Sequence, residues 1–102
     1  YIRLDPKVID IVRKMAAADK PIAAICHGQQ VLVSAGVIKG RTCMAYPAVQ
    51  PDIEGSGCTY VGPNAGFSNA VVDGNLVTAP AWPAHPEWMR KFLQVLGTTI
   101  NP

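Results

Sequence analysis

Apolar residues follow a helical spacing in some segments and form unbroken runs in others, and this pattern predicts the elements. Val8 and Val12 lie one turn apart behind Asp5 and Pro6, which suit the N-cap and the first position of a helix. Residues 22–25 are continuously apolar, as is typical of a parallel strand buried on both faces. The chain is therefore expected to begin with a helix and a buried strand.

The middle of the chain continues this alternation. A second helix is expected from Gly28 to about Ala35, because Gly36 is a natural residue to follow a helix C-terminus. Weaker patterns predict three short elements: a strand at residues 41–45, a helix at 49–54 and a strand at 59–61.

The last third of the chain predicts a hairpin and one more helix. Two short apolar runs, 70–72 and 76–78, flank a Gly-containing turn at 73–75. The final helix is expected from residue 86 to Gly97, where the glycine ends it. Its core-facing positions share helical spacing and are expected to be buried: Trp88, Phe92 and Leu96.

Helices that alternate with strands indicate an α/β fold, in which helices cover both faces of a sheet. Only about two strands have the pattern of buried parallel strands, and the first helix has no strand before it. We therefore expect residues 1–102 to be the C-terminal half of one domain, with the N-terminal half absent from this chain.

Composition narrows the function classes. The 102 residues are 49% hydrophobic and 16% charged, with a net charge of +2 and scattered basic residues. This balance gives no reason to expect nucleic-acid or membrane binding, and the apolar runs are too short to span a bilayer. Cys26, Cys43 and Cys58 are odd in number and lack metal-ligand spacing. We expect a reducing, cytoplasmic compartment, no metal and no other cofactor.

Cys26 is the strongest candidate for chemistry. The order Ala24-x-Cys26-x-Gly28, between a strand and a helix, has the layout of a nucleophile elbow with Cys in place of Ser. A helix N-terminus favours the thiolate, which is the nucleophilic form. The alternative is a buried Cys that only packs at the strand end. His27 is either a base for this thiol or a residue that points away from it. Cys43 and Cys58 are expected to be structural thiols.

Four segments together resemble one known family. Residues 23–28 (Ala-Ala-Ile-Cys-His-Gly), 39–41, 45–47 and 72–78 are similar, in this order, to the ThiJ/PfpI superfamily. That superfamily includes PfpI-type intracellular proteases, the parkinsonism-associated deglycase and the glutathione-independent glyoxalases (glyoxalase III). The resemblance implies a flavodoxin-like sandwich with a mostly parallel central sheet, of which this chain is the C-terminal half. It also implies a homo-oligomer.

The resemblance assigns roles unevenly. Cys26 matches the family nucleophile, and Gly28 matches the glycine whose amide helps to form the oxyanion site. His27 matches the PfpI and glyoxalase branches, whereas the parkinsonism-associated branch has a small residue there. No position matches the catalytic glutamate, since Glu54 and Glu87 are the only glutamates and both follow the elbow. An upstream segment or a partner chain is expected to supply that carboxyl.

Three further residues are candidates for the substrate pocket. Tyr46 follows a predicted strand, and Trp82 is a possible wall for a small carbonyl substrate. The segment around His85 resembles the glyoxalase-like branch, although this histidine is also placed to cap the last helix.

The implied function is cysteine-dependent conversion of small reactive dicarbonyls, such as methylglyoxal and glyoxal, to hydroxy acids without glutathione. Deglycation of their adducts would use the same addition chemistry. Two alternatives stay open. One is a PfpI-type intracellular cysteine peptidase, and the other is a redox-sensing or chaperone-like subunit that uses the reactive thiol without turnover.

Overall fold

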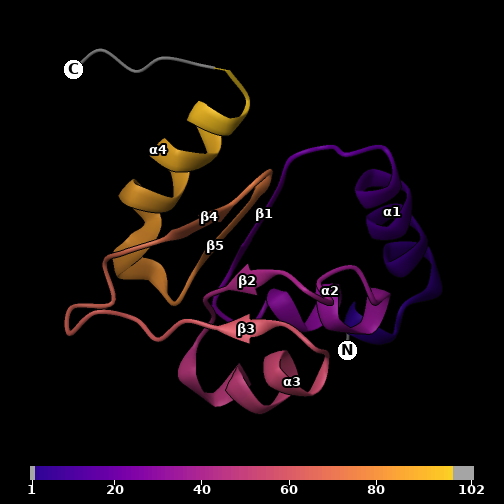
Figure 1. The fold of residues 1–102 in the computed structure, drawn as a ribbon, viewed down its shortest axis with the longest axis horizontal. Coiled ribbons are helices and arrows are strands. Elements are labelled where there is room, and N and C mark those ends of the chain that lie inside the picture. Colours follow the sequence, from indigo (N-terminus) through magenta and orange to yellow (C-terminus); the bar gives the residue numbers. More distant parts are fainter. Residues whose placement is uncertain (1, 98–102) are drawn as a thin grey trace.

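The computed structural model describes residues 2–97 and has a three-stranded sheet at its centre (Figure 1). The strands β1 (Ile22–Ile25), β5 (Leu76–Ala79) and β4 (Val71–Asp73) lie in the order β1-β5-β4. β1 pairs with β5 in parallel, and β4 pairs with β5 as the antiparallel hairpin that the sequence predicted. Gly74 has a φ of +59° in the two-residue loop, where a side chain would be strained.

A second, separate pair of strands accounts for two weaker predictions. The expected strands at 41–45 and 59–61 are present as β2 (Thr42–Cys43) and β3 (Thr59–Tyr60). They are shorter than expected and pair in parallel with each other rather than joining the central sheet. Side chains, not a backbone ladder, connect β2 to the hairpin: the Met44 amide donates to Thr78 Oγ1 at 2.8 Å.

The helices lie close to their predicted positions. They are α1 (Pro6–Ala17), α2 (Gln29–Ala35), α3 (Gln50–Gly55) and α4 (His85–Val95), with short 3₁₀ turns at Ile2–Leu4, Pro47–Val49 and Trp82–Ala84. Asp5 caps α1 as expected, since its carboxylate accepts from the Lys7 amide at 2.8 Å. Gly36 ends α2 with a φ of +72°. Within residues 2–97, none of these helices is long and apolar enough to cross a membrane.

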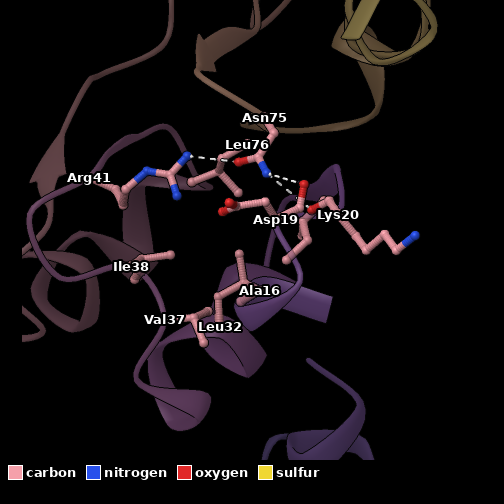
Figure 2. A pocket seen from close by; sticks show the side chains of 10 residues that line it. Ala16, Asp19, Lys20, Leu32, Val37, Ile38, Arg41, Asn75 and Leu76 are labelled. Atoms are coloured by element: carbon pink, nitrogen blue, oxygen red, sulfur yellow. Dashed lines mark hydrogen bonds between the residues drawn. The ribbon is translucent and has the colours of Figure 1, made fainter. Parts of the chain in front are cut away.

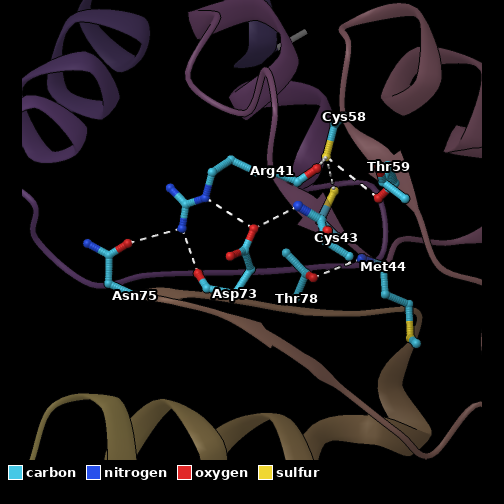
Figure 3. Close-up of polar contacts among 9 residues, drawn as sticks. Arg41, Cys43, Met44, Cys58, Thr59, Asp73, Asn75 and Thr78 are labelled. Carbon is cyan, nitrogen blue, oxygen red and sulfur yellow. Dashed lines mark hydrogen bonds and ion pairs between the residues drawn. The ribbon is translucent and has the colours of Figure 1, made fainter.

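The elements form layers on either side of the sheet. α4 packs against β5 and β1, and Figure 3 shows it on the opposite side of the sheet from β2. The main core lies on the β2 side, where α2, α3 and the β2–β3 pair meet the sheet. Its buried members include Leu32, Cys43, Ile53, Cys58 and Leu76. A smaller cluster of alanines, Ala70, Ala79 and Ala84, lies towards α4.

Two burial predictions are wrong. β1 was expected to be buried on both faces, but only Ala24 in it is fully buried, whereas all four residues of β5 are. The reason is strand order, because β5 has a partner on each side and β1 pairs only with β5 among residues 2–97. The last helix was expected to bury Trp88, Phe92 and Leu96, but Trp88 and Phe92 are only half-buried, with Trp88 against the alanine cluster, and Leu96 is 51% exposed.

Candidate functional site

Cys26 lies at a sharp turn between β1 and α2. Its φ is +62°, in the left-handed region that a residue with a side chain rarely adopts. Two backbone hydrogen bonds of 3.1 Å hold the residue: its amide donates to the Ala79 carbonyl, and its carbonyl accepts from the Tyr46 amide. The ends of β1 and β5 and the segment after β2 therefore impose the turn. This is the backbone geometry of a nucleophile elbow.

Gly28 is required by the close approach of the turn. A Cβ on this residue would lie 3.1 Å from the Ile25 carbonyl oxygen, tighter than ordinary contact. The Gly28 amide already donates to that same oxygen at 2.9 Å. Among residues 2–97, the His27 amide makes no hydrogen bond. The sequence assigned the oxyanion role to the Gly28 amide, which already has a partner, whereas the neighbouring His27 amide has none within the described residues.

Cys26 and His27 contact each other directly. The Cys26 Sγ lies 3.1 Å from His27 Nδ1, so of the two arrangements that the sequence left open for His27 the structure has the one in contact with the thiol. The thiol is half-buried and the imidazole is exposed. The contact places a histidine nitrogen, which can act as a base, beside a nucleophilic sulfur.

Aromatic rings flank His27 on one side. The Tyr46 ring stacks on the imidazole with centroids 5.1 Å apart, and Phe67 meets the edge of Tyr46 at 6.3 Å. Tyr46 therefore lies at the candidate site, as the sequence suggested. Phe67 was missed, because it belongs to an irregular loop that no local pattern connects to the elbow.

Gln29 is the second residue that the sequence reasoning missed. Its side chain is fully buried, and its Nε2 donates to the carbonyls of Ala24 (3.2 Å), Met44 (2.6 Å) and Ala79 (3.1 Å). These carbonyls belong to the three segments that hold Cys26. A signal was present, since Gln29 shares the apolar stripe of α2 with the buried residues Leu32 and Ala35. A polar side chain at a core position is expected to form hydrogen bonds there.

Trp82 and His85 lie elsewhere in the described chain. Trp82 is 77% exposed, and it makes no hydrogen bond or ring contact with the Cys26–His27 pair within residues 2–97. His85 is the first residue of α4 and does not cap it, because the N-cap is Ala84 and no side chain bonds there. Its ring lies 6.0 Å from that of Trp88. Neither residue lines the groove that His27 and Gly28 border.

An open groove of about 340 Å³ adjoins His27 and Gly28. Arg3 lines it, held by Ser34, whose Oγ accepts from Arg3 Nε at 3.0 Å, and by an ion pair with Asp52 at 3.6 Å. Gln30 also lines the groove and donates to the same Asp52 carboxylate at 3.1 Å. His27 and Gly28 therefore border a groove that holds a fixed cation, whereas Cys26 is not among the residues that line it.

A smaller hollow of about 80 Å³ lies at the other end of the sheet, where β1 and β5 begin. Figure 2 shows Arg41, Asn75 and Asp19 along one side of it, and apolar residues of the Leu32–Ile38 region along the other. Because β1 and β5 run in parallel, this hollow and Cys26 lie at opposite strand ends. The hollow is thus separate from the thiol chemistry.

Partly exposed charges and buried thiols cluster between β2 and the hairpin. The Thr42 amide, at 2.7 Å, and the Arg41 guanidinium hold the pKa of the Asp73 carboxyl below its ordinary value. Burial and the neighbouring Cys58 thiol raise the pKa of Cys43. Within residues 2–97, no three His, Cys, Asp or Glu side chains gather as a metal site would require.

These observations define the class of protein: an α/β fold with a strained cysteine at a strand-to-helix turn, in contact with the histidine that follows it. The profile of the DJ-1/PfpI family matches residues 1–95. The chain belongs to the DJ-1/PfpI family, which confirms the resemblance found in the sequence.

Relatives place the chain within longer proteins. It is 44% identical over 101 residues to protein DJ-1 homolog D of Arabidopsis thaliana, covering 99% of this chain and 26% of that protein. It is 40% identical over 95 residues to a deglycase of Pyrococcus horikoshii, covering 93% of this chain and 54% of the relative. The chain thus spans about half the length, or less, of these curated relatives.

Solved structures share the fold. A two-domain protein of Anabaena variabilis, with DJ-1/ThiJ/PfpI-like and ferritin-like domains, superimposes with a TM-score of 0.85 at 28% identity and covers 95% of this chain and 26% of that one. Glyoxalase III of Candida albicans superimposes with a TM-score of 0.80 at 15% identity, and the match covers 92% of this chain and 51% of that one. The flavodoxin-like fold expected from the sequence is therefore confirmed.

Proposed function

We propose that this chain carries the nucleophile of a cysteine-dependent enzyme that acts on small reactive dicarbonyls, such as methylglyoxal or glyoxal, or on their adducts with amines. The observation that carries the proposal is the 3.1 Å contact between Cys26 Sγ and His27 Nδ1 at a backbone turn with a φ of +62°. The similarity to a protein named as a deglycase supports the same class of chemistry.

The reaction follows from this pair. The Cys26 thiolate adds to the aldehyde carbon and forms a hemithioacetal, while the carbonyl oxygen takes up a proton. The His27 amide, free of other hydrogen bonds among residues 2–97, is the donor for the developing oxyanion. A proton then moves from the carbon of the former aldehyde to its neighbour, with His27 as one relay. Water releases the hydroxy acid and restores the thiol.

A carboxyl from outside this chain completes the proposed site. Among residues 2–97, no carboxylate bonds to Cys26 or His27, and Glu87 is already paired with Arg90 and Lys91. β1 has strand pairing only along its β5 edge in this part of the chain. We expect an upstream segment or a second subunit of a homo-oligomer to pair along the other edge and to bring the carboxyl to the thiol.

A cysteine peptidase is the second candidate, and one observation favours it. The groove beside His27 and Gly28 is open and has a volume of about 340 Å³, and Trp82 does not close it. An open groove suits an extended peptide better than a small dicarbonyl. In that reading His27 activates Cys26 for acyl transfer.

The test uses the natural full-length protein that contains this chain. Consumption of methylglyoxal and formation of lactate are measured for the wild type and for Cys26→Ala, in parallel with cleavage of an unstructured fluorogenic peptide. We expect kcat/KM for methylglyoxal to fall by about 10³-fold or more in Cys26→Ala. Cys58→Ala, which removes a thiol away from the elbow, is the matched control and should keep turnover.

Each other outcome has a distinct meaning. Peptide cleavage without dicarbonyl turnover favours the peptidase. Oxidation of Cys26 without turnover of either substrate favours the redox-sensing subunit. Equal methylglyoxal turnover by the wild type and Cys26→Ala contradicts the proposal.

A further inference from the structure

A second pair of thiols lies in the core, away from the elbow. Cys43 is the last residue of β2 and Cys58 comes just before β3, and their Sγ atoms are 3.2 Å apart (Figure 3). Both side chains are buried, with Cys43 fully enclosed and Cys58 4% exposed. The proposed function uses neither sulfur.

The strand pairing holds these two sulfurs together. β2 and β3 run in parallel with Thr42 opposite Thr59, so Cys43 and Cys58 are diagonal neighbours on adjacent strands. A disulfide has an S–S distance of about 2.05 Å, so the sulfurs need to approach by only about 1 Å. Side-chain rotations together with a small shift of the two short strands supply a movement of this size.

The two thiols differ in their readiness to react. Burial raises the pKa of Cys43, and the Cys58 thiol beside it raises it further, which makes Cys43 slower to react with a peroxide. Cys58 keeps a small exposed area, and its Sγ lies 3.0 Å from the Arg41 carbonyl. A small oxidant therefore meets Cys58 first, and Cys43 is positioned to attack the oxidised sulfur.

We propose that Cys43 and Cys58 form a redox modification site, at which a small hydroperoxide converts the two thiols into an intramolecular disulfide. In the first step the Cys58 sulfur attacks the O–O bond, which gives a sulfenic acid and releases one water, or an alcohol from an organic peroxide. In the second step the Cys43 sulfur attacks the sulfenyl sulfur and displaces its oxygen as water. Two thiols lose two electrons and two protons, and the peroxide is reduced.

The chain's protease sites make the modification directly measurable. Trypsin leaves Cys43 and Cys58 in one peptide, residues 42–90, and Cys26 in another, residues 15–39. Cleavage after Glu54 then separates Cys43 from Cys58 unless a disulfide joins them. The natural full-length protein is exposed to hydrogen peroxide, quenched, unfolded, alkylated, digested and analysed by mass spectrometry.

We expect the 42–90 peptide to be lighter by two hydrogens and to carry no alkyl label, and its two halves to stay joined after Glu54 cleavage until a reductant is added. Cys26→Ser should give the same disulfide, because the elbow thiol takes no part. Cys58→Ala should lose it and leave Cys43 fully labelled.

Two outcomes would overturn the proposal. One is full alkylation of Cys43 and Cys58 in wild-type protein at peroxide doses that oxidise Cys26. The other is a disulfide from Cys58 to any cysteine but Cys43. Both are read from the wild-type digest, so they do not depend on whether Cys58→Ala folds, and neither depends on dicarbonyl turnover.

Discussion

The two ends of the parallel strands β1 and β5 are held by different kinds of side chain. At the N-terminal ends of the strands the neighbouring segments are joined by charged side chains, whereas at the C-terminal ends they are joined by the neutral amide of Gln29. At the first end, the Arg41 guanidinium bonds to the Asp73 carboxylate at 3.2 Å, to its carbonyl at 2.6 Å and to Asn75 Oδ1 at 3.2 Å. Asn75 in turn donates to the Asp19 carbonyl at 2.9 Å. The hairpin turn, β2 and the loop before β1 are thereby tied together by partly exposed polar groups.

At the other end, Gln29 reaches the carbonyls around Cys26 from a fully buried position. Its Oε1 has no partner among residues 2–97. Cys26 itself holds a strained φ of +62° there. Gln29 therefore fixes the elbow from inside without adding a charge of its own, and the nearest ion pair described at this end, Arg3–Asp52, belongs to the groove that His27 and Gly28 line.

The largest effect on stability is expected from Gln29→Leu. The change leaves the Met44 and Ala24 carbonyls buried without this donor, at a cost on the order of 3 kcal/mol in the free energy of unfolding. The elbow should also loosen, so Cys26 should react with iodoacetamide at a different rate in the folded protein. Urea unfolding and timed alkylation measure the two effects.

Gln94→Leu is the matched control, because Gln94 is exposed on α4 and should change the free energy of unfolding by less than about 0.5 kcal/mol. Equal stability losses in the two variants would mean that Gln29 does not hold the elbow. A stability loss with an unchanged alkylation rate would limit its role to packing.

A moderate effect is expected at the ionic end from Asp73→Asn. The Thr42 amide and the Arg41 guanidinium lower the pKa of Asp73 in the folded protein, so the ionised carboxylate stabilises the fold above its unfolded pKa. That contribution is lost as the pH falls through the lower, folded pKa. The free energy of unfolding of Asp73→Asn should be about 1 kcal/mol lower than that of the wild type at neutral pH. It should also fall less steeply than that of the wild type as the pH is lowered.

Asp10→Asn provides the comparison for Asp73→Asn. Asp10 pairs with Lys14 at 3.0 Å on the open surface of α1, where an ion pair contributes little. The urea midpoint of Asp10→Asn should stay close to that of the wild type from pH 7 down to pH 3. If Asp10→Asn flattens the acid limb as much as Asp73→Asn, the Asp73 network is not the acid-sensitive element.

Local chemistry explains why the elements could be predicted. The Asp5 cap, the Gly36 terminus and the Gly74 turn each depend on residues within a few positions, and all three are present as expected. The sharp turn at Cys26 follows from the small residues at Ala24 and Gly28. Tyr46 was named as a candidate because it follows the predicted strand at residues 41–45, and its ring stacks on His27.

Long-range geometry explains what the sequence could not supply. Whether β1 or β5 is the buried strand depends on sheet order, which no local pattern contains. Phe67 reaches Tyr46 from a loop about twenty residues away. The proximity of Cys43 and Cys58 likewise depends on the β2–β3 pairing, so their spacing in the sequence gives no sign of a 3.2 Å contact.

The smallest effect is expected from Leu96→Ala, just after α4. Leu96 is 51% exposed, so the change should cost about 0.5 kcal/mol or less in the free energy of unfolding. Ile53→Ala is the reference, because Ile53 is fully buried in the main core and its truncation should cost about 2–5 kcal/mol. Urea unfolding of both variants of the natural full-length protein measures the two losses in free energy of unfolding.

A loss for Leu96→Ala that approaches that of Ile53→Ala would mean that a further segment or subunit covers this face of α4. Leu96 would then lie at an interface rather than on an exposed surface.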